Sequence, residues 1–171
     1  MSGIEHRKFA PQHLRVAVLT ISDSRAAAMR EGKDEDVSGK IIERRLQEAG
    51  HGSTRLIVPD DARRIRAAVK KFISDKKIDA VITAGGTGIT SRDVTVETLQ
   101  PLFGKELSGF GEVLRSKGYE KVGGPAFLTR ATAGLIKRKP VFCLPGAPNA
   151  VEVAMDLILP ELGHLVKHAR E

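Results

Sequence analysis

The sequence contains no tryptophan, one tyrosine and six phenylalanines among its 171 residues. Proteins that bind single-stranded nucleic acid stack the bases on aromatic side chains. The scarcity of aromatic residues therefore argues against that class, even though the net charge is +7. A basic balance can equally serve a phosphate-rich small molecule, so we expect no nucleic-acid partner.

Two further absences concern compartment and membrane. The single cysteine, Cys143, cannot form an internal disulfide, which fits a reducing cytosol; it lies in an apolar run, and we interpret it as a core residue. No apolar run approaches the roughly 18 residues of a membrane-spanning helix. The N-terminal residues contain no apolar signal core. We therefore expect a cytoplasmic protein with no membrane partner.

The chain has the length of one ordinary domain, and 41% hydrophobic residues are enough for a packed core. We predict a tail over residues 1–13 and a single domain over 14–171. Buried strands are expected at 14–21, 54–58, 79–84, 131–136 and 141–144. Helices are expected at 38–49, after an N-cap at residue 60 or 61, at 94–102, 108–118 and from about 150 onward, with a loop over 22–36. The helix after residue 60 or 61 shows the clearest apolar period, from Ile65 to Ile73.

The alternation of strands and helices predicts an α/β fold, and continuously apolar strands indicate a parallel sheet covered on both faces. In such a sheet the loops that follow the strands meet at one edge, where ligands bind. The segments expected there are Ser22–Ser24, Asp60–Asp61, Gly85–Asp93 and Leu144–Asn149. Glycine loops and acidic side chains therefore converge on one predicted site.

The segment "TAGGTGITSRDVTVE", residues 83–97, contains the most informative loop. Glycines let a backbone approach a ligand closely, and the amides of such a loop attract anions. A P-loop would require Gly-Lys-Ser/Thr at its end, but Gly88 is followed by Ile89. The Gly-x-Gly-x-x-Gly dinucleotide pattern also fails, because Ser91 stands where its last glycine belongs. The loop suits phosphate without matching either common nucleotide motif.

An aspartate beside a phosphate site is unfavourable unless a cation lies between them. Asp60 and Asp93 could hold Mg²⁺ together with phosphate oxygens. Alternatively these residues are helix N-caps, Asp60 or Asp61 for one helix and Asp93 for the next. Arg92 could neutralise phosphate charge or be an ordinary surface residue, and Asp23 could line the site or form a turn. His164 and His168, spaced i, i+4, resemble half a zinc site, but without a glutamate next to the first histidine we favour a solvent-exposed face.

Five motifs together resemble the MogA/MoaB family of molybdenum-cofactor proteins, and most of all its MoaB-type members. Besides the glycine loop, the chain contains "VLTISDSR" at 18–25, "VPDD" at 58–61, "SGFGEVLR" at 108–115 and "LPGAPNAVE" at 144–152. Their order is that of the family, and they span nearly the whole chain. One departure is Ala147, where some relatives have asparagine or glutamine between glycine and proline.

The resemblance implies a three-layer α/β/α sandwich with a mostly parallel sheet. It implies adenylyl transfer from Mg²⁺-ATP to the terminal phosphate of molybdopterin, with release of pyrophosphate; the alternative is a catalytically silent molybdopterin carrier or scaffold. Asp60 and Asp93 would be catalytic and hold Mg²⁺. A homo-oligomer is implied, with a hexamer favoured and a trimer possible. The residues expected to bind pterin, phosphate or nucleotide are Ser22, Asp23, Gly85, Gly86, Thr87, Gly88, Ser91, Arg92, Thr95, Pro145, Gly146 and Asn149.

Overall fold

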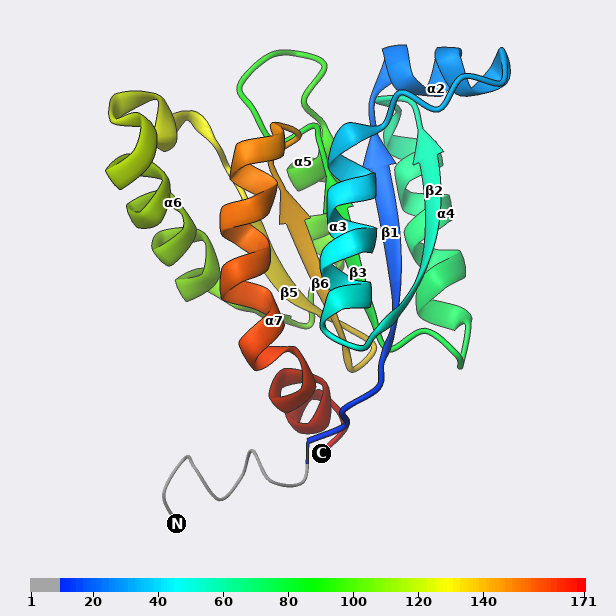
Figure 1. Ribbon diagram of the computed structural model, residues 1–171, viewed down its shortest axis with the longest axis vertical. Helices are drawn as coiled ribbons and strands as arrows, with labels where there is room; N and C mark the ends of the chain where they lie inside the picture. The colour runs from blue at the N-terminus through cyan, green and yellow to red at the C-terminus, as the bar shows by residue number, and fades with distance from the viewer. Residues whose placement is uncertain (1–9) are drawn as a thin grey trace.

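The computed structural model describes residues 10–171 of the chain (Figure 1). Most of the predicted tail therefore lies outside the described residues, and the division into a tail and one domain stays a prediction. The elements are, in chain order, β1 (Arg15–Ile21), α2 (Asp23–Arg30), α3 (Val37–Glu48), β2 (Gly52–Val58), α4 (Ala62–Ser74), β3 (Ala80–Ala84), α5 (Thr95–Leu99), the 3₁₀ helix η1 (Gln100–Leu102), β4 (Lys105–Glu106), α6 (Ser108–Val122), the 3₁₀ helix η2 (Gly124–Leu128), β5 (Thr132–Ile136), β6 (Lys139–Leu144) and α7 (Pro148–Arg170).

The six strands form one sheet in the order β2-β1-β3-β6-β5-β4. The first four strands are parallel, whereas β5 pairs antiparallel with both β6 and β4. Between β5 and β6 the chain turns at Lys137 and Arg138, which both have positive φ, as tight hairpin turns require. The prediction of a mostly parallel sheet is confirmed, and the antiparallel strands lie together at one edge.

Helices cover both faces of the sheet, which makes the predicted three layers. Figure 1 shows α3, α6 and α7 in front of the sheet and α4 and α5 behind it. Side chains of a strand alternate between faces: in β1, Val16 and Val18 belong to the core under α3 and α7, while Ala17, Leu19 and Ile21 belong to the core under α4. Both faces of β1 are buried, which explains why its sequence is continuously apolar.

Two local expectations are wrong. Residues 22–36 were expected as a loop, but they contain α2, because Ser22 accepts a hydrogen bond from the Arg25 amide as an N-cap and alanines at 26–28 favour a helix. The C-terminal helix α7 also begins at Pro148, two residues earlier than expected, because proline suits the first turn of a helix. No helix described in residues 10–171 combines the length and apolarity needed to cross a membrane.

Candidate active site

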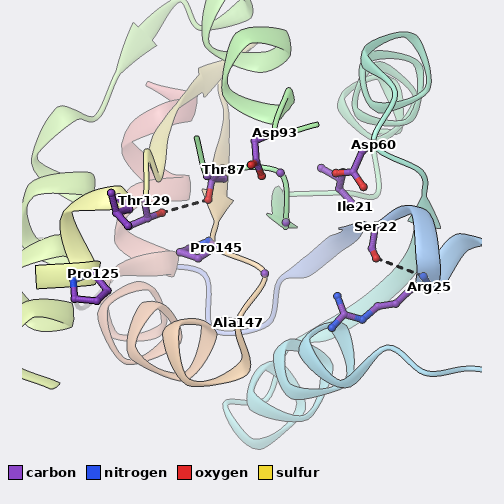
Figure 2. Close-up of a pocket in the computed structure, with 15 residues that line it drawn as sticks. Ile21, Ser22, Arg25, Asp60, Thr87, Asp93, Pro125, Thr129, Pro145 and Ala147 are labelled. Atoms are coloured by element: carbon purple, nitrogen blue, oxygen red, sulfur yellow. Dashed lines mark hydrogen bonds between the residues drawn. The ribbon is translucent and has the colours of Figure 1, made fainter. Parts of the chain in front are cut away.

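The loops after β1, β2, β3 and β6 meet at the carboxyl edge of the sheet and line a cavity of about 450 Å³ (Figure 2). Because these four strands are adjacent and parallel, their carboxyl ends lie side by side. The predicted site residues that line the cavity are Ser22, Asp60, Gly85, Gly86, Thr87, Gly88, Asp93, Pro145 and Gly146. The structure does not bring Asp23, Ser91, Arg92, Thr95 or Asn149 to its lining.

The glycine loop after β3 packs tightly against its neighbours. Gly85 has φ +112°, and a Cβ there would lie 2.1 Å from the Ile21 carbonyl oxygen; Gly86 has φ +67°, and its Cβ would lie 2.3 Å from Thr95 Oγ1. Only glycine fits both the backbone angles and the space. Within residues 10–171, the amides of Gly86 and Thr87 donate to no protein acceptor, so they remain available to an anionic ligand.

Thr95 stabilises this loop from behind. Its hydroxyl donates to the Gly85 carbonyl at 2.8 Å and its amide to the Gly86 carbonyl at 3.0 Å. The side chain is fully buried. Thr95 therefore lies under the loop, and its direct contact with the ligand stays a prediction.

Asp60 and Asp61 differ in their roles: one is the N-cap of α4, and the other faces the cavity. Asp61 is the N-cap of α4 and accepts from the Arg64 amide at 2.9 Å. Asp60 instead faces the cavity, and its carboxylate accepts from the Asp23 amide at 2.9 Å. Burial raises the pKa of Asp60, and the negative charges of Asp23 and Asp93 act in the same direction. A cation near this carboxylate would relieve both effects.

Asp93 lies across the glycine loop from Asp60 (Figure 2). Its carboxylate accepts from the Thr90 amide at 2.9 Å and from the Thr90 hydroxyl at 2.6 Å, so it closes its own turn and does not cap α5. A Cβ on Gly88 would lie 2.9 Å from Asp93 Oδ2. Burial opposes ionisation, but hydrogen bonds from Thr90 and Gly88 prevail and lower the pKa of Asp93, which keeps this carboxylate negatively charged.

Arg92 and Asp23 pair with each other at the surface. The Arg92 guanidinium donates to the Asp23 carboxylate and thereby lowers the pKa of Asp23. Asp23 Oδ1 also accepts from the Asp60 amide at 3.1 Å, so the pair ties the start of α2 to the Asp60 loop. Ser91 is exposed in the same turn as Arg92. Asp23, Ser91 and Arg92 lie beside the cavity and are not part of its lining.

The loop after β6 closes the cavity on the side of α7. Gly146 lies against Gly85, since its Cβ would come within 3.3 Å of the Gly85 Cα, and its carbonyl accepts from the Ser38 hydroxyl at 2.7 Å. The side-chain oxygen of Asn149 accepts a hydrogen bond from the Ala150 amide at 2.9 Å. Asn149 borders an apolar hollow between α6 and α7 that adjoins the cavity and shares Pro145 and Ala147 with its lining.

Sequence reasoning missed two arginines. Arg25 lines the cavity from α2 (Figure 2), one residue beyond the Ser22–Ser24 segment that was expected at this edge. Arg130 precedes β5 and donates to the Gly88 carbonyl at 2.8 Å, to the Asp93 carbonyl at 3.1 Å and to the Glu97 carboxylate. No local sequence pattern indicates the role of Arg130, because its three partners are distant in sequence.

Metal chemistry at this cavity would depend on two carboxylates. No cluster of three or more His, Cys, Asp or Glu side chains suited to a metal ion occurs within residues 10–171. Mg²⁺ is usually bound through one or two carboxylates, with substrate phosphates and water completing its shell. Asp60 and Asp93 fit that requirement. Cys143 plays no part, because full burial raises its pKa to about 12 and keeps the thiol neutral, as expected for a core residue.

The chain is similar to known proteins over nearly its whole length. A family profile described as "Probable molybdopterin binding domain" matches residues 17–164. A Pyrococcus furiosus protein named molybdopterin adenylyltransferase is 46% identical over 171 residues, covering 98% of each chain. Bacillus subtilis molybdenum cofactor biosynthesis protein B is 44% identical, covering all of this chain and 99% of its own.

Solved structures of MoaB proteins are also similar to this one. The crystal structure of the tungsten cofactor synthesizing protein MoaB from Pyrococcus furiosus superposes with a TM-score of 0.82 at 46% identity, covering 95% of this chain and all of that one. A crystal structure of a molybdenum cofactor biosynthesis protein B gives 0.87 at 44% identity, covering 94% and 98%. Both similarities extend over the whole fold. The chain therefore belongs to the family of molybdopterin-binding domains that includes the MoaB proteins.

Proposed function

We propose that the protein is a molybdopterin adenylyltransferase. It transfers the adenylyl group of ATP to the terminal phosphate of molybdopterin and releases pyrophosphate. The observation that carries this proposal is that Asp60 and Asp93 line one cavity with the glycine loop. The proposal is supported by the Pyrococcus furiosus relative, whose name states this activity.

The reaction brings two polyanions together, so holding and aligning them is the main task of the site. The terminal phosphate oxygen attacks the α-phosphorus of ATP, and the bond from that phosphorus to the pyrophosphate oxygen breaks. A phosphate monoester is already ionised near neutral pH, so no general base is required. This leaves metal binding as the natural role of both aspartates.

Each part of the cavity has a proposed task. The free amides of Gly86 and Thr87 and the guanidinium of Arg25 bind phosphate oxygens. Asp60 and Asp93 would hold Mg²⁺, and this ion would neutralise charge on the transferring and leaving oxygens. Arg92 and Asp23 fix the Asp60 loop through their ion pair.

The remaining predicted residues have proposed binding roles as well. Ser22, Pro145 and Gly146 line the cavity and are proposed to contact the nucleotide or the pterin. Ser91 and Asn149 lie outside the lining, so their contact with substrate requires a molecule that extends beyond the cavity. We also propose a cytoplasmic location, for which the reduced Cys143 is the support.

Assembly into a homo-oligomer is part of the proposal, with a hexamer favoured over a trimer. Large apolar side chains are exposed on α6 and η2, and contact with another subunit would remove them from water. The exposed side chains are Val113, Tyr119, Val122, Phe127 and Leu128. Phe127 is 74% exposed, which makes it the strongest candidate for burial against another subunit.

Pyrophosphate release tests the proposed activity. Purified protein with molybdopterin and Mg²⁺-ATP is expected to release pyrophosphate, and Asp93→Ala is expected to abolish release while molybdopterin binding persists. Asp61→Ala is the matched control: it removes an N-cap and lowers stability by about 0.5–2 kcal/mol, but turnover continues. Binding of molybdopterin without pyrophosphate release by the unaltered protein would favour the silent carrier instead.

A further inference from the structure

His164 and His168 lie on the last turns of α7, far from the cavity. Residue 164 is sixteen residues from the start of α7 at Pro148, which corresponds to about 24 Å along a helix. Their rings meet edge to face, with centroids 4.5 Å apart. The Nε2 atoms of the two rings are separated by 2.8 Å. Nothing in the proposed adenylyl transfer uses this pair.

The opposite nitrogen of each ring faces a carboxylate. His164 Nδ1 lies 3.4 Å from Glu161 Oε2, and His168 Nδ1 lies 3.0 Å from Glu171 Oε2. An ionised carboxylate can only accept a hydrogen bond, so each contact suits an Nδ1 atom that carries a hydrogen. That arrangement leaves the two Nε2 atoms, 2.8 Å apart, to be bridged by a shared proton or by a metal ion.

We propose that His164 and His168 form a binding site for a late first-row divalent cation such as Zn²⁺. Neutral imidazole suits this class of metals. Metal-bound histidines commonly donate their other N–H to a carboxylate, which fixes the ring orientation, and Glu161 and Glu171 occupy those positions. The sequence spacing alone favoured a solvent-exposed face; the converging nitrogens and the two carboxylates are what the structure adds.

The geometry requires a small adjustment. Metal–nitrogen bonds of 2.0–2.1 Å at a tetrahedral angle place two nitrogens about 3.3 Å apart, so the rings must separate by about 0.5 Å. His168 is exposed and His164 is partly exposed, which leaves room for this movement. His168 and Glu171 also border a hollow of about 310 Å³.

Local charge partly opposes and partly favours a cation. Lys105 and Arg138 border the same hollow and weaken binding. The two glutamates and the carbonyl end of α7 attract a cation. Since residues 10–171 contain no cluster of three metal-binding side chains, the site is expected to bind more weakly than a structural zinc site and to keep open coordination positions.

Calorimetric titration with Zn²⁺ tests this proposal, using the full chain without a histidine tag and with excess Mg²⁺ to occupy the carboxylates of the cavity. We expect one saturable Zn²⁺ per chain. His164→Gln and His168→Gln should each lower the affinity at least tenfold. Glu171→Gln should lower it by about tenfold, in the range found when a carboxylate partner of a metal-bound histidine is removed.

His13→Gln is the matched control, because it removes another exposed histidine and should leave the affinity unchanged. The site is exposed, so every variant is expected to fold, which circular dichroism checks. Cu²⁺ should bind more tightly than Zn²⁺ to the same two nitrogens, with loss in the same variants. No saturable binding by the unaltered chain, or unchanged affinity in the His164→Gln/His168→Gln double variant, would overturn the proposal.

Discussion

Asp60 combines partial burial with two negative neighbours, and its raised pKa means that its ionised form destabilises the fold. A carboxyl group with a raised folded-state pKa contributes stability below its unfolded value, near 3.8, and loses that contribution as the pH rises through the folded value. At pH 7 the ionised side chain is therefore a cost to stability. Such a cost is typical of a group retained for function.

Replacing Asp60 with asparagine should separate stability from activity. Asp60→Asn keeps an oxygen that can accept from the Asp23 amide but removes the charge, so the variant should melt at a higher temperature than the unaltered protein at pH 7. The gain should shrink toward pH 4, and pyrophosphate release should be lost. Melting curves across this pH range provide the check; a gain that is independent of pH would contradict the electrostatic explanation.

Arg130 is expected to position Asp93 and not to contact substrate. It binds the carbonyls on either side of the turn that carries Asp93. Arg130→Lys keeps the charge, but one ammonium nitrogen cannot reach both carbonyls that the guanidinium binds through separate nitrogens, so the turn should shift. Misplacement of a reacting group by about 1 Å can cost about 100-fold, so we expect kcat to fall tenfold to 100-fold with little change in KM.

Arg138→Lys provides the comparison for Arg130→Lys. Arg138 also donates to a backbone carbonyl, that of Ala169, but it lies remote from the cavity. Steady-state kinetics of the two variants should therefore differ. Equal losses of kcat, or a loss confined to KM for Arg130→Lys, would count against a positioning role.

At the scale of elements, α3 is attached to the sheet through buried charges. Asp36 is fully buried, caps α3 through the Gly39 amide at 2.9 Å, and accepts from the Thr20 hydroxyl at 2.6 Å. Arg55 on β2 donates to the same carboxylate at 2.9 Å. Since Ser38 of α3 binds the Gly146 carbonyl, this network also supports the loop after β6.

Removing Arg55 should leave the charge of Asp36 buried and unpaired. Breaking a buried ion pair from one side typically costs about 3–5 kcal/mol, so Arg55→Met should lower the free energy of unfolding by about that amount in urea titrations. Arg44→Met, which breaks the exposed pair with Glu152, should cost at most about 1 kcal/mol. Similar losses in the free energy of unfolding for the two variants would show that the Arg55–Asp36 pair stabilises the fold no more than an exposed pair does.

The elements also show what could be predicted from the sequence. Continuously apolar strands and their order along the chain predicted the carboxyl edge at which Asp60 and Asp93 meet. Three features escaped prediction. The sequence around α2, residues 22–36, is mostly polar and therefore suggested a loop. The short strand β4 consists only of Lys105 and Glu106. Arg130 acts through contacts with residues 33 to 42 positions away along the chain. The strand β4 and the role of Arg130 depend on tertiary contacts that a local pattern does not contain, whereas α2 has local signals in its Ser22 N-cap and its alanines.

At the scale of the whole molecule, the apolar side chains on α6 and η2 predict assembly. Light scattering of the unaltered protein should give a hexamer, and Phe127→Asp should yield smaller species because a charge cannot be buried unpaired at an interface. Ile89→Asp, at another exposed apolar residue that lies outside α6 and η2, should leave the assembly intact. A monomeric unaltered protein would rule out the proposed interface.

The central proposal is that Asp60 and Asp93 share a divalent cation with a bound polyphosphate. The most direct test is a crystal structure with Mg²⁺ and a non-hydrolysable ATP analogue. We predict a cation that is ligated by one oxygen from each aspartate at about 2.0–2.1 Å and by phosphate oxygens of the nucleotide. A nucleotide bound away from the glycine loop, or a cation that contacts neither carboxylate, would contradict the account.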